Sequence, residues 1–67
     1  MPYTPIEYDD VEVLDRFDLG WTVRIGNQLV VVSFYVPLFG TEAVYVGDRG
    51  RMVLPKWFAE QWGLPLP

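Results

Sequence analysis

The side chains able to carry chemistry are few in this 67-residue sequence, which contains neither histidine nor cysteine. Histidine is the commonest general base and neutral metal ligand, and cysteine supplies thiolate zinc sites and disulfides. A nucleophile–base pair would have to be assembled from Ser33, Lys56, a few threonines and tyrosines, and carboxylates. We therefore predict a protein that is not an enzyme and that uses no cofactor.

Acidic residues are concentrated at the start of the sequence. The first 20 residues carry a net charge of −5 and the remainder +1, which together give the −4 of the whole chain. Six acids lie there: Glu7, Asp9, Asp10, Glu12, Asp15 and Asp18. They fit a solvated edge strand, a docking face by which this acidic chain imitates nucleic acid toward a basic partner, or a cation site. No calcium-loop spacing is present, so we predict no metal site and take all six as candidates for a partner-binding acidic face.

Alternating apolar and polar residues predict strands over the first half of the sequence. Residues 1–10 hold two prolines and are expected to form an extended N-terminal arm, either loose or laid across the body. From residue 11 to residue 19 the alternation predicts a strand. It is interrupted at Leu14 and Asp15, which indicates a β-bulge or an irregular edge strand.

A hairpin is the strongest local prediction. Trp21 to Ile25 alternate as a half-buried strand, and Gly26-Asn27 suits a two-residue turn that requires positive φ. The returning segment 28–36 is apolar on both faces, which predicts the central strand of the fold or half of a subunit interface.

The second half predicts three more elements before a helix: a strand at 41–46, a four-residue loop at 47–50 and a strand at 51–54. Pro55 suits the first position of a helix over 56–62, and Gly63 suits its C-terminal cap. We therefore predict one domain, 11–67. Its fold class is mainly β, with about five antiparallel strands as a curved sheet or small SH3-like barrel and one short C-terminal helix.

Residues 44–64 contain a Gly-Arg turn at Gly50, an apolar strand, a Pro-Lys pair at Pro55, a short helix and a closing Gly63-Leu64. This pattern, over about a third of the sequence, resembles the first half of the AbrB/MazE swapped-hairpin family of transcription regulators and antitoxins. The resemblance implies an intertwined homodimer. Its basic residues facing DNA would be Arg49, Arg51 and Lys56.

A shorter pattern uses some of the same residues. Val53-Leu54-Pro55 followed by Trp57 and Ala59 resembles the end of the small β domain of GINS replication-complex subunits. That resemblance implies a domain that docks on partner subunits. A strand that ends in proline before an amphipathic helix is also a common way to close a small β domain, with the aromatic residues covering its core. All three interpretations of this segment, AbrB/MazE-like, GINS-like and generic, stay open.

The expected function is that of a non-enzymatic protein–protein interaction module. We expect a small acidic accessory subunit or phage-type inhibitor that docks on a larger protein, such as a nucleic-acid-processing one, or on its own copy. The apolar candidates for partner contact are Trp57, Phe58, Trp62 and Tyr35. The alternative is an AbrB/MazE-like dimeric DNA-binding regulator or antitoxin, the only case with a nucleic-acid partner. The longest apolar stretch, 29–36, is too short to span a bilayer, so we expect no membrane and a cytoplasmic location.

Overall fold

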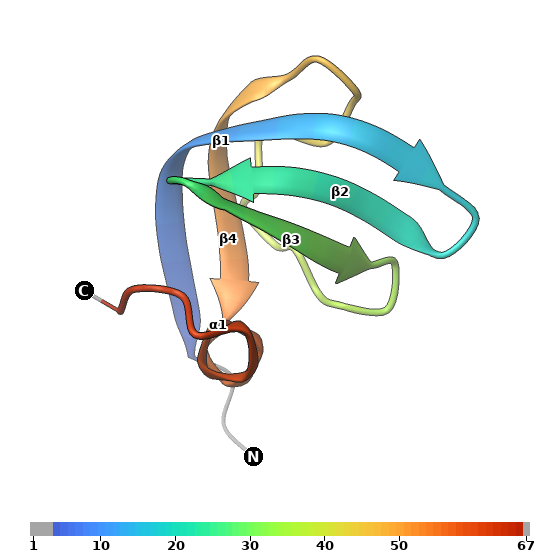
Figure 1. Cartoon of the computed structure of the whole chain (residues 1–67). Coiled ribbons are helices and arrows are strands. Elements are labelled where there is room, and N and C mark those ends of the chain that lie inside the picture. The colour runs from blue at the N-terminus through green and yellow to red at the C-terminus, as the bar shows by residue number, and fades with distance from the viewer. Residues whose placement is uncertain (1–3, 67) are drawn as a thin grey trace.

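The computed structural model describes residues 4–66, which form four strands and one helix. These are β1 (Pro5–Phe17), β2 (Gly20–Ile25), β3 (Gln28–Ser33), β4 (Arg49–Pro55) and α1 (Lys56–Trp62). The strands make one open antiparallel sheet in the order β3-β2-β1-β4 (Figure 1). The prediction of a mainly β fold with a short C-terminal helix is confirmed. The described residues form four strands instead of five, and the sheet is open, not a barrel.

The missing strand is the one predicted at 41–46. The carboxylate Oδ2 of Asp48 accepts the backbone N–H groups of Val44 and Tyr45, at 3.2 and 3.0 Å. A ladder would need those N–H groups, so this local turn competes with strand pairing. Asp48 also donates its own N–H to the carbonyl of Tyr45, and the segment forms a turn that precedes β4. The predicted loop at 47–50 is shorter as well, because β4 already begins at Arg49.

β1 bends because its ladder is interrupted twice. Its register with β4 shifts between Tyr8 and Val11, and its register with β2 shifts between Val13 and Asp15. Asp10, at the first shift, has φ 56° and is the one non-glycine residue of the described part with positive φ. The first half of β1 therefore pairs with β4 and the second half with β2 (Figure 1).

One prediction about β1 is confirmed and one needs correction. Of the bulge or irregular edge strand predicted at Leu14 and Asp15, the bulge is present, and β1 has a neighbour on each side. The chain also does not divide after residue 10, because residues 5–10 are the first half of β1 and Tyr8 is buried. Residues 1–3 of the predicted arm lie outside the described residues.

The β2–β3 hairpin forms as predicted around Gly26 and Asn27. Gly26 has φ 61° while Asn27 has negative φ, which is the pattern of a type II′ turn. The strand predicted over 28–36 ends at Ser33 and lies at the edge of the sheet, not at its centre. The apolar side chains on its outer face, Leu29 and Val31, are exposed.

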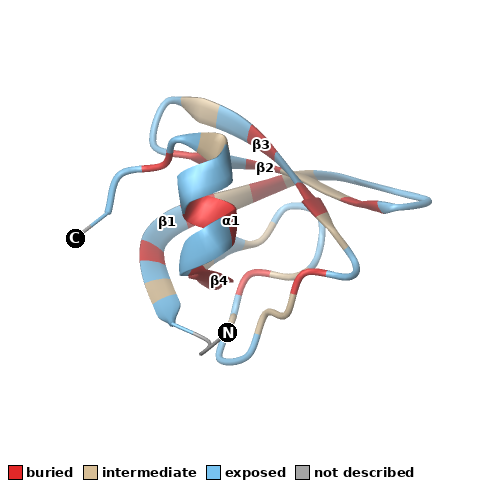
Figure 2. Cartoon of the chain, turned by 90° about the horizontal axis from the view of Figure 1, so that it is seen from below, coloured by how far each residue is buried: buried red, intermediate tan, exposed pale blue. Residues whose placement is uncertain are grey.

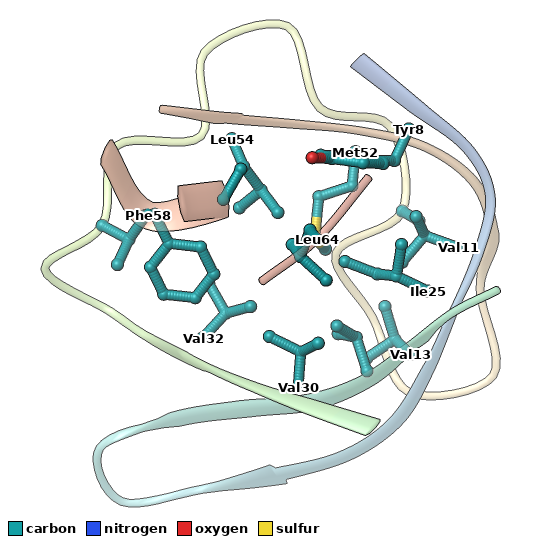
Figure 3. Close-up of a cluster of buried hydrophobic side chains, with 14 residues drawn as sticks. Tyr8, Val11, Val13, Ile25, Val30, Val32, Met52, Leu54, Phe58 and Leu64 are labelled. Atoms are coloured by element: carbon teal, nitrogen blue, oxygen red, sulfur yellow. The ribbon is translucent and has the colours of Figure 1, made fainter. Parts of the chain in front are cut away.

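The core lies between the sheet and α1, and the described residues include no buried polar or charged residue. Figure 3 shows its side chains: valines from β1 and β3 and Ile25 of β2 lie around a common interior with Met52 and Leu54 of β4, Phe58 of α1, and Leu64. α1 buries Phe58 and Ala59 and leaves much of its remaining surface exposed (Figure 2).

α1 ends as predicted at Gly63, which has φ 66°. The N–H groups of Gly63 and Leu64 donate to the carbonyls of Glu60 and Ala59, which is a Schellman cap. After the cap, Leu64 returns into the core. No helix in the described part of the chain has the length and apolar character needed to cross a membrane.

The part-buried hydroxyl of Tyr8 fastens the C-terminal segment to β1. The hydroxyl of Tyr8 donates a hydrogen bond of 2.8 Å to the backbone carbonyl of Pro65. Burial raises the pKa of Tyr8 above its ordinary value of 10.0, because the phenolate would lose hydration. The protonated hydroxyl is therefore the form that the fold favours.

Candidate interaction surfaces

Aromatic side chains gather around Arg16 at the end of the sheet where β1 turns into β2 and β3 ends. The guanidinium of Arg16 lies over the ring of Phe34, 5.3 Å from its centroid. Trp21 meets the same ring edge-on, with centroids 4.6 Å apart and planes at 84°. Cation–π and edge-to-face contacts of this kind favour a defined arrangement of the three side chains.

Two hollows flank Arg16. The first, of about 500 Å³, is lined by Arg16, Phe17, Asp18 and Phe34. The second, of about 260 Å³, is lined by Arg16, Trp21, Val44 and Tyr45. We call the residues around these two hollows the aromatic end: Arg16, Phe17, Asp18, Trp21, Phe34, Val44 and Tyr45.

The aromatic end is accessible and contains an unsatisfied donor. Tyr45 is 74% exposed, and Phe17 and Phe34 are each exposed over more than a third of their surface. The indole Nε1 of Trp21 is buried without an acceptor among the described residues. An unpaired buried N–H costs about 1–3 kcal/mol, so this ring is held in place by its apolar contacts.

The sequence did not predict the aromatic end, apart from including Asp18 among the acids. Arg16 and Trp21 are close in sequence, but Phe34 arrives from the end of β3 and Tyr45 from the turn before β4. Only the order of the strands brings these segments together. The high aromatic content, 16% of the chain, was the one available signal, and it does not locate a surface.

Half of the predicted acidic face is paired with the chain's own arginines. Carboxylate–arginine distances are 2.8 Å for Glu12 with Arg24, 3.3 Å for Glu7 with Arg51 and 3.9 Å for Asp10 with Arg49. In the remaining half, a carboxylate oxygen of Asp15 accepts the N–H of Arg16. Asp9 and Asp18 form no ion pair within residues 4–66. That part of the chain also has no acidic cluster suited to a metal ion.

The basic candidates are largely engaged. Arg51 bridges Glu7 and Glu42, at 3.3 and 3.2 Å, and Arg49 lies near Asp10. Lys56, at the first position of α1, is exposed and has no ion-pair partner in the described part. Two of the three cations are thus set against carboxylates.

The apolar candidates separate into core and surface. Phe58 is 4% exposed and belongs to the core cluster with Leu54 (Figure 3), so it is not available to a partner. Trp62 packs partly against the same cluster, one helical turn from Phe58. Trp57 and Tyr35 are exposed, with Tyr35 at 91%. The i,i+4 spacing places Phe58 and Trp62 on the same face of α1, and in the structure this is the face that packs on the core.

Comparison with protein-family models, with curated proteins and with solved structures gives no match for this chain. The AbrB/MazE and GINS resemblances of its second half accordingly stay predictions.

Proposed function

We propose that this chain is a non-enzymatic protein–protein interaction module that docks on a larger protein as an accessory subunit or an inhibitor. The aromatic end is the observation that carries the proposal. Trp, Tyr and Arg dominate the binding energy of protein interfaces, and exposed apolar patches mark such interfaces. Arg16, Trp21 and Tyr45 supply these residue types around a single hollow.

The charges nearby favour a partner with basic residues around an apolar anchor. Asp18 lines the first hollow beside Phe17 and Phe34, so an apolar group and a cation have adjacent places there. The net charge of −4 attracts a basic partner over longer distances. Such complementarity raises the association rate and orients the encounter more than it adds affinity.

The alternative function is a dimeric DNA-binding regulator of the AbrB/MazE type. It requires Arg49, Arg51 and Lys56 to contact phosphates, and phosphate neutralisation dominates DNA affinity. The carboxylates of Asp10, Glu7 and Glu42 lie against the two arginines. These ion pairs favour the docking module over the DNA-binding regulator.

The test is capture of the partner from cells that express the chain. The wild-type protein is expected to recover one dominant protein, and the double variant Phe17→Ser/Tyr45→Ser is expected to recover at least tenfold less. Leu66→Ser is the matched control, since Leu66 is also exposed but lines neither hollow. Equal recovery by wild type and the double variant would exclude the aromatic end as the docking surface.

The DNA-binding alternative has its own readout. Retardation of duplex DNA at about 50 mM salt, abolished by Arg49→Ala/Arg51→Ala, would replace the docking module with the regulator. The docking proposal expects no retardation.

A further inference from the structure

The outer edge of β3 presents backbone groups that have no partner among residues 4–66. Phe34 donates its N–H to the carbonyl of Leu19, 2.9 Å away, and β2 and β3 pair in continuous register. Bonded and non-bonded pairs alternate along an antiparallel ladder. Val30 and Val32 therefore bond to β2, whereas Leu29 and Val31 direct their N–H and C=O groups outward. No residue between 4 and 66 bonds to those outward groups.

The same stretch is apolar on its outward face. Leu29 is 59% exposed and Val31 43%, and their cross-strand neighbours on β2 are Arg24 and Thr22. Folded proteins usually protect an edge with charges, prolines or bulges. β3 has none of these, and the whole segment 25–41 lacks a charged residue.

We propose that the outer edge of β3 pairs antiparallel with β3 of a second copy of this chain, so that one sheet runs through a two-fold dimer. With the axis at Val31, Val31 faces its own counterpart and Leu29 of one copy faces Ser33 of the other. This register forms about six backbone hydrogen bonds, two of which end on Ser33 carbonyls that also accept the N–H of Val36 in their own copy. It also joins the exposed Leu29 and Val31 side chains of both copies into one apolar stripe.

The distribution of charge selects a second copy as the occupant. The acidic residues of the sheet lie on β1, two strands away from the free edge (Figure 1). In the dimer the two β1 strands are five strand spacings apart, roughly 24 Å. The Debye length at physiological ionic strength is about 8 Å, so their repulsion is screened. The edge itself has no charge to attract a basic or acidic partner, whereas an identical uncharged strand matches it.

α1 leaves this edge open beyond its first residue. The side-chain amide of Gln28 donates to the carbonyl of Trp62 at 2.8 Å, which is the hydrogen bond that joins the helix to β3 in the described part. The pairing uses residues 29–33 and none of the residues that line the two hollows. Dimerisation is thus independent of the proposed docking function, and either can fail without the other.

Sedimentation velocity across about 10–500 μM tests the proposal. Wild type is expected to approach twice its 7.8 kDa monomer mass as concentration rises. Val31→Lys places two ammonium groups together at the axis and is expected to weaken the dimer at least tenfold. Val46→Lys is the matched control, because Val46 is 57% exposed in the turn before β4. A wild-type monomer throughout the range, or an unchanged dimer in Val31→Lys, overturns the proposal.

Amide hydrogen exchange of the wild type gives a readout that needs no variant. The N–H groups of Leu29 and Val31 are expected to become protected as concentration rises, while those of Val30 and Val32 are protected at every concentration. A dimer in which Leu29 and Val31 still exchange as freely as in the monomer uses another surface and overturns the proposal. Protection that appears only when a different protein is added overturns it too.

Discussion

The two edge strands of the sheet, β4 and β3, differ in whether their outward backbone N–H and C=O groups have hydrogen-bond partners. At the β4 edge, the hydroxyl of Thr41 bonds to both the N–H and the carbonyl of Val53, at 2.8 and 3.3 Å. The carbonyl of Arg51 accepts the N–H groups of Glu42 and Ala43. At the β3 edge, the corresponding groups of Leu29 and Val31 are unpaired within residues 4–66. A segment that is not a strand can therefore close an edge, and residues 4–66 close only the β4 edge.

Ion pairs also join the β4 edge to the segments beside it. Arg51 holds Glu42 of the covering segment and Glu7 of β1 on the two sides of β4. Exposed ion pairs contribute little to stability, so their main effect is to specify which segment lies there. β3 has no charged residue with which to specify a cover. The closed edge is thus specific to this chain's own loop, and the open edge is suited to another strand.

The largest expected effect comes from a glycine of β2 that lies against the β3 backbone. A Cβ on Gly20 of β2 would lie 2.1 Å from the carbonyl oxygen of Val32, so the β2–β3 ladder would have to separate. We expect Gly20→Ala to cost about 3 kcal/mol or more in the free energy of unfolding, measured by urea denaturation.

Gly50→Ala on β4 is the matched control for this substitution. Its Cβ would meet nothing closer than a carboxylate oxygen of Glu42 at 3.7 Å. A change of less than about 0.5 kcal/mol is expected, as for a substitution without strain. Similar losses for the two variants would show that the contact at Gly20 does not control the β2–β3 pairing.

The second prediction concerns Thr41, whose hydroxyl closes the β4 edge. Thr41→Val keeps the shape of the side chain but leaves the N–H of Val53 without its acceptor. A loss of about 1–2 kcal/mol is expected, because one partner of a part-buried hydrogen bond is removed. The amide of Val53 should also exchange faster with solvent, which hydrogen-exchange measurements detect.

Thr22→Val, on the outer face of β2, tests whether the loss is specific. Thr22 has no side-chain hydrogen bond in the described structure, so its substitution is expected to be nearly neutral. Equal costs at positions 41 and 22 would mean that the hydroxyl of Thr41 does not protect the β4 edge.

Local signals in the sequence predicted the turn and the cap but not the edges. Gly26-Asn27 and Gly63 were predictable because the turn and the helix end need particular backbone angles at these positions, whatever the rest of the fold. The strand predicted at 41–46 failed because Asp48 captures N–H groups that alternation assigns to a ladder. Two apolar faces on 28–36 indicate either a central strand or half of an interface, and the position of β3 at the edge of the sheet excludes only the central strand. Strand order is set by long-range pairing, which short patterns do not encode.

The site was less predictable than the fold for the same reason. The acidic residues were identifiable by type, yet the pairing of Glu12 with Arg24 depends on the β1–β2 register. The aromatic end depends on the end of β3 meeting Arg16. Phe58 was assigned to a binding surface because helical spacing alone does not reveal which face covers the core.

A third prediction concerns the attachment of the C-terminal segment to the β1–β4 side of the sheet. Tyr8→Phe removes the hydrogen bond to Pro65 and is expected to cost about 1 kcal/mol at neutral pH. Because burial raises the pKa of Tyr8 in the folded state, its contribution is complete below pH 10 and is lost as pH rises through the folded pKa. Unfolding free energy measured against pH should therefore decline less steeply above pH 10 in Tyr8→Phe than in wild type.

Tyr35→Phe provides the comparison for that alkaline profile, since Tyr35 is 91% exposed. It should leave both the stability at neutral pH and the alkaline decline unchanged. A decline that persists in full in Tyr8→Phe would assign the effect to another group.

The smallest expected effect lies at the bend of β1, which lets one strand serve both sides of the sheet. Asp10 holds φ 56°, where glycine has no steric cost, whereas Asp9 has negative φ. Asp10→Gly should therefore shift the unfolding free energy by less than about 0.5 kcal/mol, while Asp9→Gly costs about 0.5–1 kcal/mol through chain entropy. If thermal denaturation shows equal losses of unfolding free energy for Asp10→Gly and Asp9→Gly, the backbone angle of Asp10 does not cause the change in pairing partner. A lower cost at Asp10 means that a single left-handed residue turns β1 from the closed half of the sheet toward the open one.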